Sequence, residues 1–259
     1  MADLNPLHLA AAFGAAFLAG AINSVAGGGT LLTFPTLIWL GLPSVAANAT
    51  STVAIWPGSV GSMFGYRREI RQTPPRMLAL VAPSAAGGIL GASLLRSTPS
   101  AVFDKIVPFL VLFATLLFML QKPAQDLLKR SKHPVHHSLR WLAGAMLFQF
   151  AVAIYGGYFG AGIGILMLAA LSILGFDDIH QMNGLKNFFG LCINGVAALY
   201  FIFAGMVQWP YVLLMAVGAV AGGVGGAGLA RRMGRTAVRR VVIAIGFGMA
   251  LSLFLRLRR

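Results

Sequence analysis

The chain has 259 residues, of which 58% are hydrophobic and only 10% are charged, and its mean hydropathy is +0.81. Soluble domains carry about 25% charged residues, so this composition excludes an ordinary soluble protein and indicates a polytopic membrane protein. The net charge of +14 does not indicate nucleic-acid binding, because nearly all basic residues lie in short loops between apolar segments. The single cysteine, Cys192, excludes an intrachain disulfide.

In chain order, the apolar segments repeat one pattern in each half: long, short, long, long, long. The segments predicted to span the membrane are 7–26, 46–66, 77–96, 102–120, 141–160, 183–204, 209–229 and 239–255. Two segments, 30–42 and 162–174, are too short to cross as straight helices, and each follows a glycine-rich stretch. We therefore predict two transmembrane repeats, 1–120 and 141–259, joined by a basic linker at 121–140.

Most lysines and arginines cluster in the loops near 67–76, 121–140 and 230–240, which the positive-inside rule assigns to the cytoplasm. With those loops inside, the two halves run through the membrane in opposite directions. The predicted fold is thus an all-α polytopic membrane protein with two inverted repeats, each with four long transmembrane helices and one short Gly-interrupted helix, re-entrant or broken. Such repeats with matching interrupted segments are typical of secondary transporters.

Two polar stripes at identical spacing support the repeat. In the first half the stripe is Asn48, Ser51, Thr52 and Ser59, and in the second it is Asn183, Lys186, Asn187 and Asn194. Residues at i, i+3, i+4 and i+11 share one face of a helix. The glycine-rich breaks GGGT at 27–30 and GAGIG at 160–164 are also in register.

At these residues the chain resembles the TauE/SafE family of sulfite exporters, also called the 4-toluene sulfonate uptake family. The matching stretches are AGAINSVAGGGTLLTFPTLIWLGLPSVAANATST and GGYFGAGIGILMLAALSILGFDDIHQMNGLKN. The second departs from the family pattern at 166–169, where LMLA stands in place of an expected proline. The resemblance covers about residues 10–255 and implies a multi-pass carrier of small sulfur-containing anions, such as sulfite or organosulfonates, in the bacterial inner membrane.

The residues themselves suggest how a small anion could be held without a metal or other cofactor. Helices starting at the two glycine breaks would direct backbone N–H groups and positive helix ends at one point. The stripes add neutral hydrogen-bond donors, and Lys186 adds a full charge inside a predicted span. The predicted substrate-binding residues are Gly27, Gly28, Gly29, Thr30, Asn48, Ser51, Thr52, Gly160, Gly162, Gly164, Asn183, Lys186 and Asn187.

The six acidic residues lie in loops or near span ends, which disfavours cation transport and favours an anion. No nucleophile–base–acid set or phosphate loop occurs, so an enzyme, a catalytic residue, a metal and a cofactor are not predicted. The leading interpretation is a secondary transporter, an exporter by the family resemblance, that alternates access between its repeats. An anion channel and a membrane assembly or interaction protein remain alternatives. The predicted partners are the small anion and the lipid bilayer, without nucleic acid, and homo-oligomer formation is left open.

Overall fold

The computed structural model describes residues 5–25, 28–65, 70–71, 75–130, 139–174, 176, 179–233 and 235–257, and all regular structure in these ranges is helical. The helices of the first half are α1 (Pro6–Val25), α2 (Thr30–Trp39), α3 (Ser44–Gly65), α5 (Pro75–Leu78), α6 (Val81–Ser97) and α7 (Ser100–Arg130). Those of the second half are α8 (Leu139–Tyr158), α9 (Ile163–Ile173), α10 (Ile179–Phe203), α11 (Trp209–Met233) and α12 (Arg235–Leu257). The all-helical prediction is confirmed.

The largest differences from the predicted boundaries lie in the second part of the first half. The predicted span 77–96 is divided into α5 and α6, with a turn at residues 79–80. Pro83 accounts for the turn. In a continuous helix its ring would clash with the backbone carbonyl four residues before it, and it has no N–H to donate to that carbonyl. Helix α7 continues past the predicted end at residue 120 to Arg130, so the first half of the predicted basic linker is helical.

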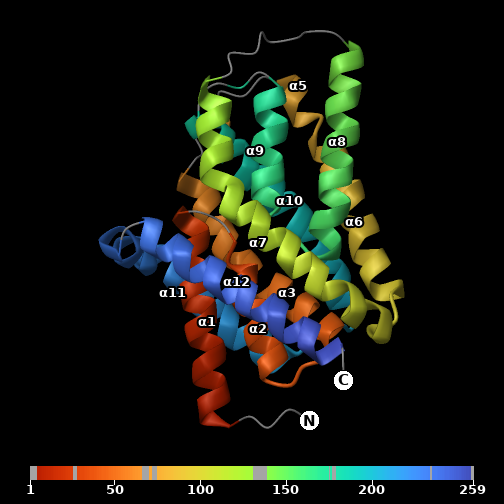
Figure 1. The fold of residues 1–259 in the computed structure, drawn as a ribbon. Helices are drawn as coiled ribbons and strands as arrows, with labels where there is room; N and C mark the ends of the chain where they lie inside the picture. Colours follow the sequence, from red (N-terminus) through yellow and green to blue (C-terminus); the bar gives the residue numbers. More distant parts are fainter. Residues whose placement is uncertain are drawn as a thin grey trace.

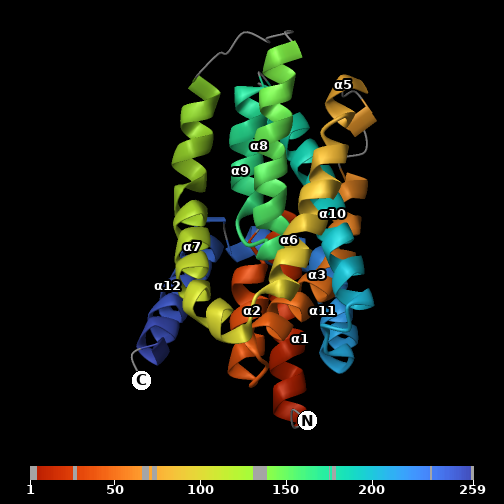
Figure 2. The same cartoon turned by 90° about the vertical axis from the view of Figure 1, so that its right-hand side faces the viewer.

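The two short helices lie at opposite ends of the molecule. In both Figure 1 and Figure 2, α1 and α2 occupy the lower part of the bundle, whereas α8 and α9 occupy the upper part. Each short helix packs against the long helix that precedes it. The chain therefore turns back on itself between each long helix and the short helix that follows it, near the middle of the bundle.

The halves are interlocked through reciprocal helix pairs. The most extensive contacts are those of α1 with α11 and of α8 with α6. Thus the first helix of each half lies along the helix that precedes the last one of the other half. Glycines permit the close approach: a Cβ atom on Gly222 would lie 1.9 Å from the backbone oxygen of Phe17, and one on Gly91 would lie 2.1 Å from that of Ile154.

Within the described residues, four helices are individually long and apolar enough to cross a membrane. They contain the stretches Pro6–Asn23, Ser100–Leu120, Gln181–Phe203 and Arg240–Leu257. Two further apolar stretches, Leu142–Tyr158 and Trp209–Val224, are shorter. These apolar helices are consistent with a membrane protein.

The contact between α1 and α11 yields a test of the packing. Gly222→Ala is expected to destabilise the protein by about 1–3 kcal/mol, because the new methyl group forces the two helix backbones apart. Gly144→Ala is the matched control, since a Cβ atom there meets nothing within 4 Å. The control should be neutral or stabilising by about 1 kcal/mol, from helix propensity. Thermal unfolding in detergent measures both variants, and equal midpoints would contradict the α1–α11 contact.

Candidate functional site

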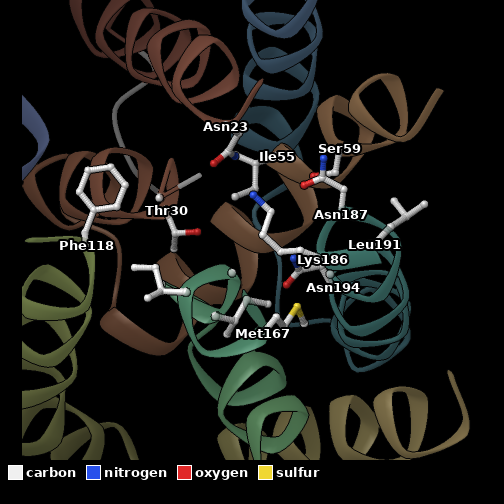
Figure 3. Close-up of a pocket in the computed structure, with 17 residues that line it drawn as sticks. Asn23, Thr30, Ile55, Ser59, Phe118, Met167, Lys186, Asn187, Leu191 and Asn194 are labelled. Carbon is white, nitrogen blue, oxygen red and sulfur yellow. The ribbon is translucent and has the colours of Figure 1, made fainter. Parts of the chain in front are cut away.

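A partly open cavity of about 110 Å³ lies where the starts of α2 and α9 meet, as Figure 3 shows. Helices α1, α3, α7 and α10 complete its wall. The polar side chains that line it belong to Asn23, Thr30, Ser59, Lys186, Asn187 and Asn194. The apolar part of the wall is formed by Ile55, Phe118, Ile163, Ile165, Met167 and Leu191. A cavity of this size has room for a small ligand or several water molecules.

The connection from α1 to α2 is held by an asparagine and two glycines. Gly28 has a φ of +93°, a conformation that strongly favours glycine. The backbone N–H of Gly29 donates to Oδ1 of Asn23 at 2.8 Å. A Cβ atom on Gly29 would lie 2.7 Å from Nδ2 of Asn23, so a side chain there would displace the amide. Asn23 therefore satisfies a backbone donor at the start of α2 while its side chain lines the cavity.

The connection from α8 to α9 uses glycine in the same way. Gly160 and Gly162 have φ values of +78° and +80°. The hydroxyl of Tyr155 donates to the backbone oxygen of Ala161 at 2.7 Å, which fixes the turn to the end of α8. Both glycines line the cavity, and so does Gly164 in the first turn of α9. The unexpected LMLA sequence is accommodated without a break, because α9 is helical from Ile163 to Ile173.

Lys186 enters the cavity from α10. Its stem crosses Gly164 of α9, where an added Cβ atom would lie 3.2 Å from the Cδ atom of the lysine. Figure 3 shows the side chain extending across the cavity, with its ammonium group directed toward Asn23 and Ile55. Within the described part of the chain, this ammonium group makes no hydrogen bond or ion pair. The charge is thus presented to the cavity rather than neutralised by the protein.

The first polar stripe lies outside the cavity, except at its end. Asn48 donates from Nδ2 to the backbone oxygen of Tyr158 at 2.8 Å, and the Ser51 and Thr33 hydroxyls are 2.6 Å apart. The hydroxyl of Thr52 donates to the backbone oxygen of Asn48 on its own helix. Asn48 is 1% exposed and Ser51 is fully buried. Asn48 thus joins α3 to α8 and Ser51 joins α3 to α2, whereas Thr52 is bonded within α3, and none of the three lines the cavity.

The cavity thus brings together only part of the predicted site. The predicted residues that line it are Gly28, Thr30, Gly160, Gly162, Gly164, Lys186 and Asn187. Gly29 packs beside the cavity against Asn23, whereas Asn48, Ser51, Thr52 and Asn183 are absent from the lining. Gly27 lies outside the described residues.

Three polar lining residues are missing from the predicted set of substrate-binding residues. Ser59 and Asn194 end the two stripes, so their spacing alone contained the signal. Asn23 belongs to neither stripe. The only sequence signal for it is a polar residue close before a glycine break in an apolar segment.

The chemistry of the cavity suits a small anion. Lys186 supplies a positive charge, and asparagine amides and hydroxyls supply neutral donors. No acidic side chain is found among the described lining residues. Across the described ranges, no group of three or more His, Cys, Asp or Glu side chains is arranged to hold a metal ion. A cation would meet the repulsion of Lys186 without a compensating carboxylate.

The chain is similar along nearly its whole length to known membrane transporter proteins. The sequence model of the family described as "Sulfite exporter TauE/SafE" matches residues 12–253. The chain is 30% identical to the probable membrane transporter protein ORF9 of a Sinorhizobium species, an alignment that covers 98% of this chain and 95% of that protein. It is 29% identical to the probable membrane transporter protein YfcA of Escherichia coli K12, over 96% of this chain and 91% of the relative. No solved structure shows significant similarity to the chain.

Two serines of α3 provide a test of the cavity. In a Cys192→Ala background, Ser59→Cys is expected to react at least about tenfold faster than Ser51→Cys with a small water-soluble thiol reagent. Ser59 lines the cavity, whereas a reagent reaches residue 51 only after a local opening, and an opening that costs about 1.4 kcal/mol already gives tenfold protection. Labelling rates followed by mass spectrometry measure the difference. Faster labelling at residue 51 would refute the assignment of the cavity.

Proposed function

Because the chain belongs to the sulfite exporter TauE/SafE family of membrane transporters, we propose that it carries sulfite or a small organosulfur anion, such as a sulfonate, across the bacterial inner membrane. The observation that supports an anion most directly is the ammonium group of Lys186, which faces the cavity without a counter-charge among the described residues. An oxyanion would accept hydrogen bonds from this group and from the neighbouring amides.

The binding site that we propose combines both halves of the chain. From the first half come Asn23 of α1, Thr30 of α2 and Ser59 of α3. From the second half come three residues of α10: Lys186, Asn187 and Asn194. At the start of α9, Gly160, Gly162 and Gly164 let a ligand approach the backbone closely, while Ile163 and Ile165 form part of the apolar wall. Asn48, Ser51, Thr52 and Asn183 would contact substrate only in another conformation of the transporter.

The transport mechanism that we propose is alternating access between two inverted repeats, residues 1–120 and 141–259. Three features support it: the same order of long and short helices in both halves, the reciprocal pairs α1–α11 and α8–α6, and the opposite placement of α2 and α9 in Figures 1 and 2. Under this proposal the basic segment 121–140 faces the cytoplasm, and the glycine turns lie near the middle of the membrane.

Removal of the charge tests the proposed site. Lys186→Ala is expected to lower sulfite flux into proteoliposomes by at least about tenfold, since a hydrogen bond to a charged group contributes about 1.5–3 kcal/mol. Lys186→Arg keeps the charge and should retain part of the flux. Lys105→Ala, which removes an exposed lysine from the first turns of α7, is the matched control.

Binding measurements on the detergent-solubilised protein separate loss of the site from loss of folding. The three variants should unfold at similar temperatures without ligand, and only Lys186→Ala should lose the stabilisation that sulfite gives to the native protein. Full flux in folded Lys186→Ala would reject the proposed role of the lysine. Failure of the native protein to bind or carry any small sulfur oxyanion would reject the proposed substrate class.

A further inference from the structure

We propose that the cavity selects monovalent anions and that the protein works as an exchanger, returning across the membrane readily only when an anion is bound. This inference rests on the proposed function, since it concerns the charge and transport mode of the same site. It follows from the balance of charge in the cavity.

The empty cavity holds an unbalanced positive charge. Lys186 is the one charged side chain among the described lining residues, and the amides and hydroxyls around it are neutral. The ammonium group cannot be balanced by a neighbouring carboxylate in the described lining, because none is present there. Its stem lies against Gly164 and its tip is directed across the cavity, so the charge stays inside the bundle instead of reaching the membrane surface.

The charge of the bound ligand decides whether the loaded cavity is neutral. One negative charge cancels that of Lys186, and the neutral donors can then satisfy the remaining oxygen lone pairs. Two negative charges would leave a net charge of opposite sign, which costs free energy in an enclosed site much as the empty cavity does. The apolar part of the wall, with Phe118, Ile163 and Met167, suits a ligand that has one uncharged side.

When the protein switches the opening of the cavity from one side of the membrane to the other, the cavity must be closed to both sides for a time and lose most of its water. Enclosing an unpaired ammonium group is unfavourable, whereas enclosing an ion pair with satisfied hydrogen bonds is much less so. The loaded protein therefore crosses this step faster than the empty one. The consequence is exchange, in which outward movement of one anion is coupled to inward movement of another. In each of these movements the bound anion and Lys186 together carry no net charge.

Methanesulfonate and sulfate provide a matched pair of probes, since they have similar tetrahedral shapes but carry one and two negative charges. Proteoliposomes preloaded with methanesulfonate should take up labelled methanesulfonate at least about tenfold faster than empty ones, which corresponds to a difference of about 1.4 kcal/mol in the barrier. Preloading with sulfate should give less than a tenth of this stimulation. An imposed potassium diffusion potential should leave the methanesulfonate exchange rate unchanged. The same series is run with hydrogensulfite in mildly acidic buffer.

The two proposals can fail separately. Equal uptake into loaded and empty vesicles, with anion binding intact, would overturn the exchange mechanism and leave the proposed function standing. Equal stimulation by sulfate and methanesulfonate would overturn the selection of monovalent anions. If the native protein neither binds nor carries methanesulfonate or hydrogensulfite, the proposed function fails and the exchange mechanism with it. In Lys186→Gln, any residual flux should lose its stimulation by preloaded anion, whereas Lys105→Gln should keep it.

Discussion

A helix can be interrupted inside a membrane only where protein or cavity water takes up the hydrogen bonds that the interruption leaves. The rest of this structure depends on that constraint. Asn23 accepts the N–H of Gly29 at one interruption, and Tyr155 donates to the oxygen of Ala161 at the other. Both interruptions border the same partly open cavity, which Asn23, Gly28, Gly160 and Gly162 line. The cavity and the two helix interruptions are thus parts of one feature of the fold.

The two halves share this geometry but differ in chemistry. At equivalent positions of the two stripes, the first half has Ser51 and the second has Lys186. A serine can be fully buried against Thr33 with its hydroxyl satisfied, whereas an unpaired lysine requires an open polar space. The cavity is lined by Lys186, Asn187 and Asn194 of the second stripe, whereas the first stripe contributes only Ser59. The other three residues of the first stripe make hydrogen bonds within the bundle. The two halves therefore contribute different chemistry to the cavity.

The sequence indicates the helices well because membrane spans are encoded by long apolar runs and interruptions by glycine. It also indicates Lys186 and Asn187, because polar residues on one face of an apolar segment are conspicuous in the sequence, and the second break, because of its glycines. It does not indicate which polar side chains have partners far along the chain, as Asn48 has in Tyr158. Nor does it indicate that Asn23, near the end of α1, bonds to the start of α2 and lines the cavity. Spacing predicts which face of a helix is polar, but only packing decides whether that face meets another helix or a cavity. The extension of α7 to Arg130 is also missed, because the predicted span is bounded by its apolar residues and the last part of this helix is polar.

The crossing of α3 and α10 lies beside the cavity and bears on the proposed alternating-access mechanism. The indole N–H of Trp56 donates to the backbone oxygen of Leu191 at 3.2 Å, and Gly195 leaves room for the ring. Trp56 follows Asn48 at the same spacing as Leu191 follows Asn183, so under the proposed repeat their contact joins corresponding points of the two halves. If the halves rock against each other, such a contact moves little, while groups further along each stripe separate or close. The cavity adjoins this crossing through Ile55 and Leu191, so access could pass from one side to the other while the α3–α10 contact persists.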